Sequence, residues 1–475
     1  MRQIVPKYKN SLKINQEKWL SILKIFLFIF VGLVIFFSLG NLADERNQIP
    51  PNNPADTTPT IQSCDYLLKN GTIVDGTGTK SYVGDVAIKE SKIIAVGKFK
   101  VLESAKVIDV TGKIIAPGFI DIHTHTENYW ITSPKGEMTL AQGITTHIAG
   151  NCGTSVDSVP EYLAQIDEKG SAVNVGLFTG YSRLRRDVGV AATSRTTEDQ
   201  ISKMQDLLKA SIEGGSFGLS VGLGYAPQNM ATTDELKELA KTVKAEDGLM
   251  AMHIRNEGNR VVESLAEAID IAKTTGVRFE YSHAKAAGKN NWSKVPKLLK
   301  MLEEAQAEGV DIMTDVYVYG FSSNDLYSDT YFSSSEDNIK LVLKHPLTMV
   351  ASDGGLQSRG IAVHPRVCGN VTRVLTKYVR DEKVLSLESA IHKMTEMPAE
   401  RLKINDRGVL KAGNQADVVV FDLNNLKENA TRNEPNRLSE GMSYVFVNGV
   451  VAIDNGSFTG NKGGVALYSS KDKPY

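Results

Sequence analysis

The chain has 475 residues, of which 41% are hydrophobic and 23% are charged, a composition that is globular and excludes a disordered chain. Its 54 Lys and Arg are balanced by 55 Asp and Glu, which argues against nucleic acid as a partner. The three cysteines, Cys64, Cys152 and Cys368, are too few for a disulfide scaffold. Their odd number leaves at least one thiol for another role.

The first 45 residues are expected to lie outside the folded body. Residues 25–43 carry no charge, and residues 25–39 are almost purely apolar, which suits a short transmembrane helix of about 17–25 residues. Six Lys or Arg against one Glu precede them, so the body should be exported and should touch the membrane only through this segment. The long basic stretch favours an uncleaved anchor. A cleaved signal peptide, which would leave a secreted or periplasmic body, is the alternative.

A linker and two β-rich segments flank the middle of the chain. Residues 46–62 are rich in Pro, Asn and Thr and read as a linker. Residues 63–115 show apolar alternation separated by Asn-Gly, Gly-Thr-Gly and Thr-Gly turns, the pattern of β-hairpins. The same pattern returns in residues 404–475. We therefore expect one small β-sandwich domain built from both ends of the exported body.

Residues 116–403 alternate between short β-like runs and amphipathic helical stretches such as residues 198–215 and 260–276. The runs lie at 117–123, 143–151, 174–181, 217–225, 249–255, 277–283, 310–317 and 347–353. Eight strands that alternate with helices predict an α/β fold, a closed parallel (β/α)₈ TIM barrel. An open doubly wound sheet is the alternative, but no G-x-G-x-x-G follows the first run.

Polar side chains that bind metals stand where several of these runs end. His123 and His125 close the first run, Cys152 follows the second, His253 closes the fifth, His283 the sixth and Asp353 the eighth. Functional groups of such barrels lie at the C-terminal strand ends. An H-x-H pair alone is weak, because hydrogen-bonded core histidines would also explain it. The six residues together predict a metal site.

The ligand types indicate which metal this site would take. A thiolate with imidazoles suits Zn²⁺, whereas an all-oxygen site would suggest Mg²⁺ or Ca²⁺. Zinc lowers the pKa of a bound water to about 7 and polarises a carbonyl. Asp353 is then placed to accept the water proton and to pass it to the leaving nitrogen. The alternatives are that Cys152 is an inert buried thiol and that Asp353 caps a turn beside Gly354.

The chain resembles the amidohydrolase superfamily and, within it, the D-aminoacylase (N-acyl-D-amino-acid deacylase) family. The resemblance runs from about Tyr66 to Leu467. It rests on the stretches GTIVDGTG, APGFIDIHTHTE, QGITTHIAGNCG, GLSVGLGYAP, HIRNEG, SHAKAAG, ASDG, HPR and GVLKAGNQADVVVFD. The H-x-H pair marks the superfamily. GNCG, in which a cysteine serves as a metal ligand, is far more specific to the D-aminoacylases.

The resemblance implies two metal positions and a set of substrate contacts. The implied ligands are Cys152, His253 and His283 for one tight zinc ion, and His123, His125 and Asp353 for a second, weaker position. Asp353 would be the catalytic acid/base. Lys285 and Arg366 would hold the substrate α-carboxylate, as cations of this kind do, and Tyr317 would help to bind substrate. Their alternative roles are solvated surface charges and an ordinary strand tyrosine.

The activity that the resemblance implies is hydrolysis of the amide bond of N-acyl-D-amino acids, with a metal-bound hydroxide as nucleophile. A dipeptidase acting on D-residue or cell-wall peptides is the nearest rival. A hydantoinase-type enzyme fits less well, because Lys285 and Arg366 imply a free carboxylate. The non-enzymatic alternative is a membrane-tethered binding protein whose barrel lost its activity together with its lid.

The chain departs from the family at the mouth of the predicted barrel. Family members usually carry a long insertion after the seventh strand, whereas only about twenty residues, 320–339, separate Tyr319 from the next helix. A shorter loop would leave the site more open and less selective. Tyr181 and Ala284 also differ from common family residues, which bears on the preferred side chain of the substrate.

Overall fold

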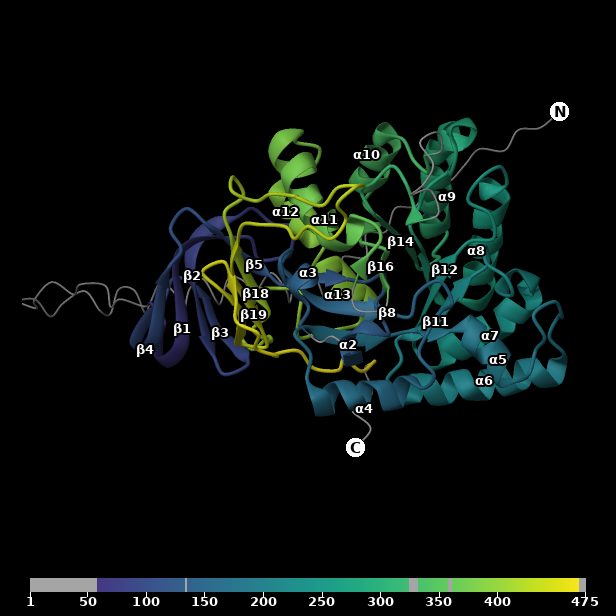
Figure 1. Ribbon diagram of the computed structural model, residues 1–475, viewed down its shortest axis with the longest axis horizontal. Coiled ribbons are helices and arrows are strands. Elements are labelled where there is room, and N and C mark those ends of the chain that lie inside the picture. Colours follow the sequence, from purple (N-terminus) through teal and green to yellow (C-terminus); the bar gives the residue numbers. More distant parts are fainter. Residues whose placement is uncertain (1–57, 133–134, 324–331, 358–360, 470–475) are drawn as a thin grey trace, which may run out of the picture. The chain divides into compact units, whose positions relative to one another are not determined.

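The structure is a computed structural model that describes residues 58–469 apart from 133–134, 324–331 and 358–360 (Figure 1). The predicted anchor or signal segment, residues 1–45, lies outside the described residues. Among those described, no helix is both long and apolar enough to cross a membrane.

Both β-rich ends of the body pair in one nine-stranded sheet (Figure 1). Its strands are β1 Thr60–Ile73, β2 Tyr82–Lys89, β3 Lys92–Gly97, β4 Lys100–Asp109, β5 Ile114–Pro117, β18 Val418–Phe421, β19 Met442–Val447, β20 Val450–Asp454 and β21 Ser457–Phe458. The order is β21-β20-β19-β18-β5-β1-β2-β3, and β4 pairs with β1. Strands β5 and β18, which pair antiparallel, join the two ends of the chain. A separate apolar cluster that includes Leu68, Val86 and Phe446 packs on this sheet.

One hairpin of this sheet shows how the sequence sets its geometry. Asn448 and Gly449 connect β19 and β20, and both have positive φ, 48° and 78°. Two such residues form the turn that matches the twist of paired strands, and Asn-Gly is the dipeptide that adopts it most readily. This Asn-Gly signal therefore marks a real hairpin. The prediction of a turn at Asn70-Gly71 is wrong, because that pair lies inside β1 at an irregularity in its register with β2.

Each of the eight predicted runs contains a strand of a parallel sheet. The strands are β6 Phe119–Asp121, β8 Ile144–Ala149, β9 Asn174–Leu177, β10 Thr179–Gly180, β11 Gly218–Gly222, β12 Leu249–His253, β13 Arg278–Tyr281, β14 Ile312–Val316 and β15 Thr348–Val350. Strands β10 to β15 form one six-stranded sheet, and β6, β8 and β9 form another. Among the described residues these ladders do not join into one closed ring. A third sheet combines β7 Thr124–His125, β16 Gly354–Gln357 and β17 Ile361–Ala362.

Alternate residues of the parallel strands pack into two different cores. Met250 and Met252 of β12 belong to the cluster that the surrounding helices share, whereas Leu249 and Ala251 belong to a second cluster. That second cluster draws apolar residues from β6, β8 and β15, such as Met349. Because side chains of a strand alternate between its faces, one face packs on helices and the other on strands from across the sheet.

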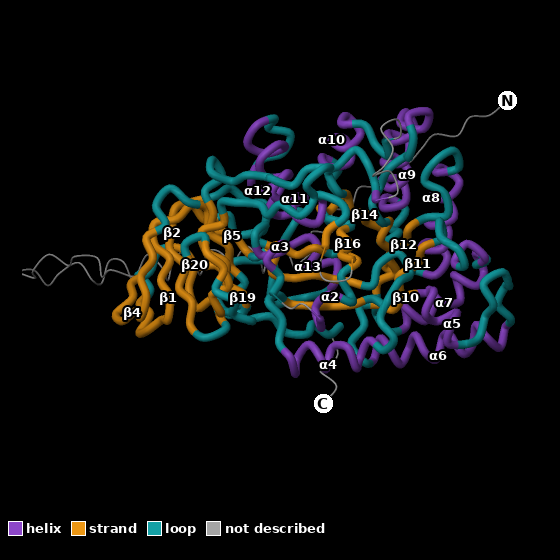
Figure 2. Tube along the Cα trace, viewed as in Figure 1, coloured by secondary structure: helices purple, strands orange, loops and turns teal. Residues whose placement is uncertain are grey.

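The helices lie outside the parallel strands (Figure 2). They are α2 Tyr129–Thr132, α3 Glu137–Leu140, α4 Val159–Lys169, α5 Tyr181–Asp187, α6 Glu198–Glu213, α7 Thr233–Ala245, α8 Val261–Thr275, α9 Val295–Ala307, α10 Glu336–Lys344, α11 Arg366–Arg373, α12 Leu387–His392 and α13 Glu396–Leu402. Short 3₁₀ helices span Gln228–Met230 and Lys289–Lys294, and a π-helical turn, Val374–Asp381, continues α11. Helix α6 begins with a capping box in which Thr197 and Gln200 satisfy each other's backbone N–H groups.

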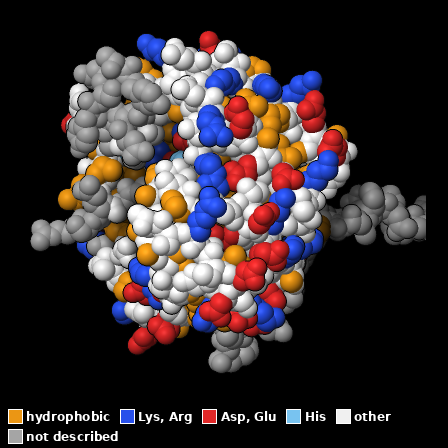
Figure 3. All heavy atoms as spheres, turned by 90° about the vertical axis from the view of Figure 1, so that its right-hand side faces the viewer, with side chains coloured by type: hydrophobic (Ala, Val, Ile, Leu, Met, Phe, Trp, Pro, Cys, Tyr) orange, Lys and Arg blue, Asp and Glu red, His pale blue; other side chains and the backbone are white. Residues whose placement is uncertain are grey.

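The outer faces of these helices carry both signs of charge. In Figure 3, basic and acidic side chains lie next to one another over the face shown. Lys209 of α6 pairs with Glu246 at 2.8 Å, and Lys273 of α8 pairs with Glu308 at 2.6 Å. Interspersed charges of this kind keep a surface solvated and do not form the continuous basic patch that nucleic acid requires.

Candidate active site

Three of the predicted site residues follow directly on parallel strands in a strained backbone conformation. Cys152, His283 and Asp353 have φ values of 51°, 40° and 50°. Side chains other than glycine adopt this left-handed region at a cost of about 1–3 kcal/mol, and such residues gather at functional sites. Gly150 and Gly153, with φ of 78° and 77°, flank Cys152. The backbone at these three strand ends is therefore shaped to turn side chains toward one point.

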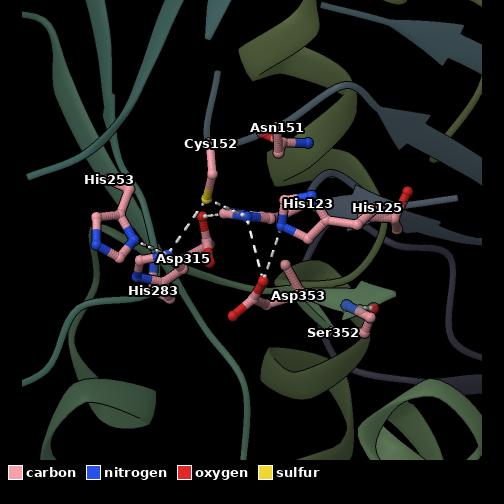
Figure 4. Close-up of polar contacts among 12 residues, drawn as sticks. His123, His125, Asn151, Cys152, His253, His283, Asp315, Ser352 and Asp353 are labelled. Carbon is pink, nitrogen blue, oxygen red and sulfur yellow. Dashed lines mark hydrogen bonds and ion pairs between the residues drawn. The ribbon is translucent and has the colours of Figure 1, made fainter. Parts of the chain in front are cut away.

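Cys152 and three histidines meet at that point (Figure 4). The Cys152 Sγ lies 3.4 Å from His123 Nε2 and 3.6 Å from His283 Nε2. The His253 Nδ1 lies 3.0 Å from His283 Nε2. One donor atom each of Cys152, His253 and His283 falls within 4.8 Å of the others, and all three side chains are buried. These are the residues predicted to bind the tight zinc ion.

The remaining predicted ligands adjoin the same cluster. The Asp353 Oδ1 lies 3.2 Å from His125 Nε2 and 3.6 Å from His123 Nε2. Two further groups of donor atoms within 4.8 Å are His123, His125 and Cys152, and His123, His283 and Asp353. Cys152 thus belongs both to the group with His253 and His283, predicted to bind the tight zinc ion, and to the group with His123 and His125. The six residues form one continuous cluster in which the two predicted positions are adjacent.

Two carboxylates that were not predicted from the sequence contact the histidine ring nitrogens that point away from the cluster. The Asp315 Oδ2 lies 3.1 Å from His123 Nδ1, and its Oδ1 accepts a hydrogen bond of 3.0 Å from the His283 backbone N–H. The Glu257 Oε1 lies 2.9 Å from His283 Nδ1, and its Oε2 lies 3.9 Å from His253 Nε2. In each case the outward ring nitrogen faces a carboxylate while the other nitrogen faces the cluster, as in metal-binding histidines.

The charges of the cluster favour a cation at its centre. Burial opposes ionisation of Cys152, but His123 and the other imidazoles hold the pKa of this thiol well below its usual value. Burial likewise opposes protonation of His123 and His125. The carboxylate of Asp315 and the Cys152 thiolate nevertheless raise the pKa of His123, and Asp353 and Cys152 raise that of His125 to about 10. The thiolate and carboxylates therefore demand positive charge at this point, which a divalent metal ion would supply.

Two cations line the cavity in front of the cluster. This catalytic cavity, of about 370 Å³, is lined by His125, Cys152, Asp353, Lys285 and Arg366 among others. The side chains of Lys285 and Arg366 are only 7% and 5% exposed. The Arg366 Nη1 lies 2.8 Å from Asp353 Oδ2, and the Lys285 Nζ lies 2.6 Å from Glu257 Oε1. The structure thus brings both predicted carboxylate-binding residues to the mouth of the predicted metal site.

Tyr317 lies beneath these cations. The Arg366 guanidinium sits 4.5 Å and the Lys285 Nζ 5.4 Å from the centre of its ring. Its buried hydroxyl and the Nε of Arg366 have no hydrogen-bond partner among the described residues. Buried donors without partners are rare in folded proteins, so both mark a place where an anion would complete the hydrogen bonding.

Comparisons with known proteins identify the family of the chain. The model of the amidohydrolase family matches residues 114–452. A D-aminoacylase of Alcaligenes xylosoxydans xylosoxydans is 30% identical and covers 86% of this chain and 98% of its own length. This chain belongs to the amidohydrolase family, in its D-aminoacylase group. An N-acyl-D-glutamate deacylase of Bordetella bronchiseptica, solved with zinc and a phosphonate inhibitor, is 30% identical with a TM-score of 0.80. It covers 86% of this chain and 100% of its own.

Membership of this family confirms the resemblance given by the sequence motifs and shows that the chain is an amidohydrolase. A D-aminoacylase structure concerned with a binuclear metal centre also superposes, with a TM-score of 0.79 and 28% identity over 86% of this chain and 100% of its own. The fold is the mixed α/β fold of these structures. The Cys, His and Asp side chains gathered in this amidohydrolase are of the types that bind metal.

Other sequence expectations concern residues near the site. Tyr181 is buried, and its hydroxyl bonds Glu235 and accepts a hydrogen bond of 3.1 Å from Arg185. The hydroxyl of Tyr181 is therefore hydrogen-bonded to other side chains of the protein. The short mouth loop is described only in part, and its Ser323 Oγ accepts a hydrogen bond of 3.0 Å from Arg366 Nη2.

Proposed function

We propose that this amidohydrolase hydrolyses the amide bond of N-acyl-D-amino acids and releases a carboxylate and a free D-amino acid. One observation carries the proposal. The metal-binding type of cluster, the Asp353 carboxylate and the buried cations Lys285 and Arg366 all line a single cavity of about 370 Å³. A cluster of this kind is suited to activating water, and paired cations are suited to holding a carboxylate. An N-acyl-amino acid presents an amide and a carboxylate side by side.

The cofactor that we propose is zinc. Cys152, His253 and His283 would hold one tight ion, and His123, His125 and Asp353 would surround a second, weaker position. A zinc ion held there would acidify a water molecule and polarise the acyl carbonyl. The D-aminoacylase structure noted above, which concerns activation by one metal and attenuation by a second, supports an unequal pair.

Asp353 is the group that we assign to proton transfer. Its buried side chain points into the catalytic cavity, and its Oδ1 lies beside two histidines of the cluster. Burial opposes ionisation, but the Arg366 guanidinium and the histidines hold the pKa of Asp353 well below its usual value. The carboxylate is therefore ionised and ready to accept a proton from the attacking water. It then passes this proton to the amide nitrogen as the C–N bond breaks.

Lys285 and Arg366 are the residues that we assign to the substrate α-carboxylate. Both are almost fully buried, and each already pairs with a carboxylate, Lys285 with Glu257 at 2.6 Å and Arg366 with Asp353 at 2.8 Å. A substrate carboxylate would form charge-assisted hydrogen bonds with the remaining N–H donors of these two cations. The ring of Tyr317 lies against both cations, and its buried hydroxyl has no hydrogen-bond partner among the described residues. Fixing the carboxylate at one point and the acyl carbonyl at another leaves the side chain and the α-hydrogen to exchange places between the two enantiomers, so a third contact at the α-carbon would select one of them.

For the fold, we propose that the eight parallel strands close a TIM barrel with the metal site at their C-terminal ends. The Asp353 N–H donates a hydrogen bond of 2.9 Å to His123 O, which brings the chain after the eighth strand beside the chain after the first. The two apolar cores on either side of the strands support the same arrangement. Residues 63–115 and 404–475 would form the small β-sandwich, with residues 116–403 as the barrel.

We also propose that the catalytic body is exported. The apolar residues 25–43 and the basic residues before them support a membrane anchor that leaves the body outside the cytoplasm, or a signal segment whose cleavage leaves it secreted or periplasmic. Fractionation of cells that express the full chain tests this. An anchor predicts activity in the membrane fraction that protease added outside can remove.

The proposed activity is tested with the full-length protein. Bound metal is quantified, and amine release is compared for N-acetyl-D-methionine and N-acetyl-L-methionine, with Asp353→Asn as the blank. We expect about one or more zinc ions per chain, the occupancy of a structural or catalytic zinc site, and D-selective release that depends on Asp353. Zinc without release from either enantiomer would contradict the proposed activity. Absence of zinc would contradict the assignment of the ligands.

A further inference from the structure

A second cavity adjoins the catalytic cavity. It measures about 670 Å³ and is formed by the segments after β12 and β13, residues 255–259 and 287–291, together with Gly224, Tyr225, His253 and Phe332. Three residues, Tyr225, His253 and Glu257, line both cavities. The second cavity therefore shares a wall with the catalytic cavity. It lies on the side of the cluster of Cys and His residues where the chain leaves β12 and β13.

The common wall is built from residues that are already fixed. The ring of Tyr225 packs on that of His253, with centroids 4.6 Å apart, and its hydroxyl lies 3.4 Å from His253 Nδ1. Glu257 is held by Lys285 at 2.6 Å and by His283 at 2.9 Å. Tyr225 is 40% exposed, so its side chain is a partition at the opening between the two cavities.

The lining of the second cavity is polar. It contains the amide side chains of Asn256, Asn259, Asn290 and Asn291, and Asn256, Asn259 and Asn290 are exposed. A primary amide has two hydrogen-bond donors and an acceptor oxygen. Asn291 uses both ends of its amide within the protein, and the Asn256 Oδ1 accepts two backbone N–H groups, so a ligand would bond mainly the exposed amides of Asn259 and Asn290. Lys289 adds an exposed positive charge at the rim, whereas Arg255 is neutralised by Glu267 at 2.8 Å. Such a lining does not suit a fatty acyl chain, but it matches the repeated N–H and C=O groups of a peptide.

The proposed position of the substrate decides which part of it would enter the second cavity. Arg366 lines only the catalytic cavity, and with Lys285 it would hold the α-carboxylate there. A free carboxylate ends the substrate on that side. The acyl group on the other side of the scissile amide is then free to extend past Tyr225.

We propose that the second cavity binds a peptidyl acyl group, so that the substrates are peptides that end in a D-amino acid. The inference rests on the proposed function and names the substrate class of the same site. Water adds its oxygen to the carbonyl carbon of the penultimate residue, the C–N bond to the D-residue breaks, and the nitrogen takes up a proton. The products are a shortened peptide with a new carboxylate and one free D-amino acid. Because Lys289 is the charge at the rim, neutral or acidic peptides are preferred over basic ones.

The test compares three substrates of the full-length, zinc-loaded protein that share a D-methionine. They are N-acetyl-D-methionine, N-octanoyl-D-methionine and N-acetyl-glycyl-glycyl-D-methionine. We expect kcat/KM to be at least about tenfold higher for the peptide than for the acetyl compound, the effect of about 1.4 kcal/mol of added transition-state binding. The octanoyl compound should give no such gain.

Two variants locate the effect. Asn290→Trp fills the second cavity and should remove the preference for the peptide, so that the ratio of the two kcat/KM values falls to about one, which is equal transition-state binding of the two substrates. Asn424→Trp places the same bulky side chain at an exposed position of the segment after β18 and should leave the ratio as in the wild type.

The outcomes separate this inference from the proposed function. If neither the acetyl compound nor the peptide is hydrolysed, the proposed function itself is wrong. If the acetyl compound is hydrolysed but the peptide is no better, or if Asn290→Trp leaves the preference intact, the second cavity is not a peptidyl site. An equal gain for the octanoyl compound would also overturn the inference, because it would show that length rather than polar recognition matters.

Discussion

The buried histidines of this amidohydrolase lie in two different environments. His123 and His283 of the site cluster are 1% and 2% exposed, and His147 of β8 is 6% exposed. Burial alone would lower the pKa of all three. In the cluster, carboxylates and the Cys152 thiolate outweigh burial, and the pKa of His283 rises to about 9. At His147 no anion among the residues that the structure describes is close enough to do so, and burial lowers the pKa to about 3.

The difference shows that the partners of a buried histidine, more than its burial, indicate whether it serves a cation. The neighbours of His147 are the Thr126 hydroxyl at 3.3 Å and the ring of Trp130, which neither attract nor repel a proton strongly. The cluster histidines face carboxylates and the Cys152 thiolate, whose effect at His283 outweighs that of the Lys285 ammonium, 3.0 Å from its Nδ1. A neutral buried histidine such as His147 contributes to the packing of the fold. Histidines that face anions, such as His123 and His283, form a site that favours a bound cation.

The largest effect is expected from removing the anion at the middle of the cluster. Cys152→Ala deletes the thiolate shared by two groups of donor atoms, so the full-length protein should lose its bound zinc and its activity. Metal per chain after dialysis measures this. Cys368→Ala is the matched control, because that thiol is equally buried but burial raises its pKa to about 12. Zinc retained at the wild-type level in Cys152→Ala would contradict the assignment.

A smaller loss is expected when proton transfer is removed but the cluster is kept. Asp353→Asn preserves the shape of the side chain and removes its charge. We expect kcat to fall by about 10²–10⁴-fold, the usual contribution of a general acid/base. Zinc at Cys152, His253 and His283 should remain. If the variant kept wild-type kcat, another group would have to move the proton.

Removing the charge of a carboxylate that bonds a cluster histidine should weaken zinc binding, with a smaller effect than the two changes above. Glu257→Gln replaces the partner of His283 Nδ1 by a neutral amide, and loss of such a partner typically weakens metal binding by about 10–100-fold. Competition with a chelator measures the zinc affinity. Glu267→Gln is the control, because that carboxylate pairs with Arg255 instead of a cluster histidine. Equal zinc affinities of the two variants would refute a positioning role for Glu257.

Much of the architecture could be predicted from the sequence, because local signals decide it. Period-two and helical patterns located a strand in each of the eight predicted runs, and the Asn-Gly turn before Val450 marked a hairpin. The rule that functional groups lie at C-terminal strand ends brought Cys152 and His283 together although 131 positions separate them. These features need no knowledge of how side chains pack.

The parts that were missed depend on contacts between distant elements. Asp315 is the last residue but one of β14, so the strand-end rule could have found it, but the prediction named Tyr317, two positions later. Glu257 lies in a segment after β12, and nothing in a strand pattern shows that it reaches His283. Tyr317 was expected to contact substrate, and only packing reveals that its ring supports two cations.

His147, the buried histidine outside the cluster, offers the last and smallest test of the contrast between the two histidine environments. An unfolded chain takes up a proton at His147 near pH 6.5, whereas the folded protein does so only near pH 3. Between these values the unfolded state binds more protons, so the stability from neutral His147 is complete above pH 6.5 and is lost as the pH falls.

His147→Gln keeps a polar group beside Thr126 but cannot titrate. Denaturant unfolding of metal-free wild type and variant at pH 7, 6, 5 and 4 gives the difference between their free energies of unfolding. We expect this difference to shift in favour of the variant by at most about 1.4 kcal/mol for each pH unit below 6.5. A difference independent of pH would mean that folding does not lower the pKa of His147. Burial without anions would then not be enough to keep a histidine neutral, and the contrast between the two environments would fail.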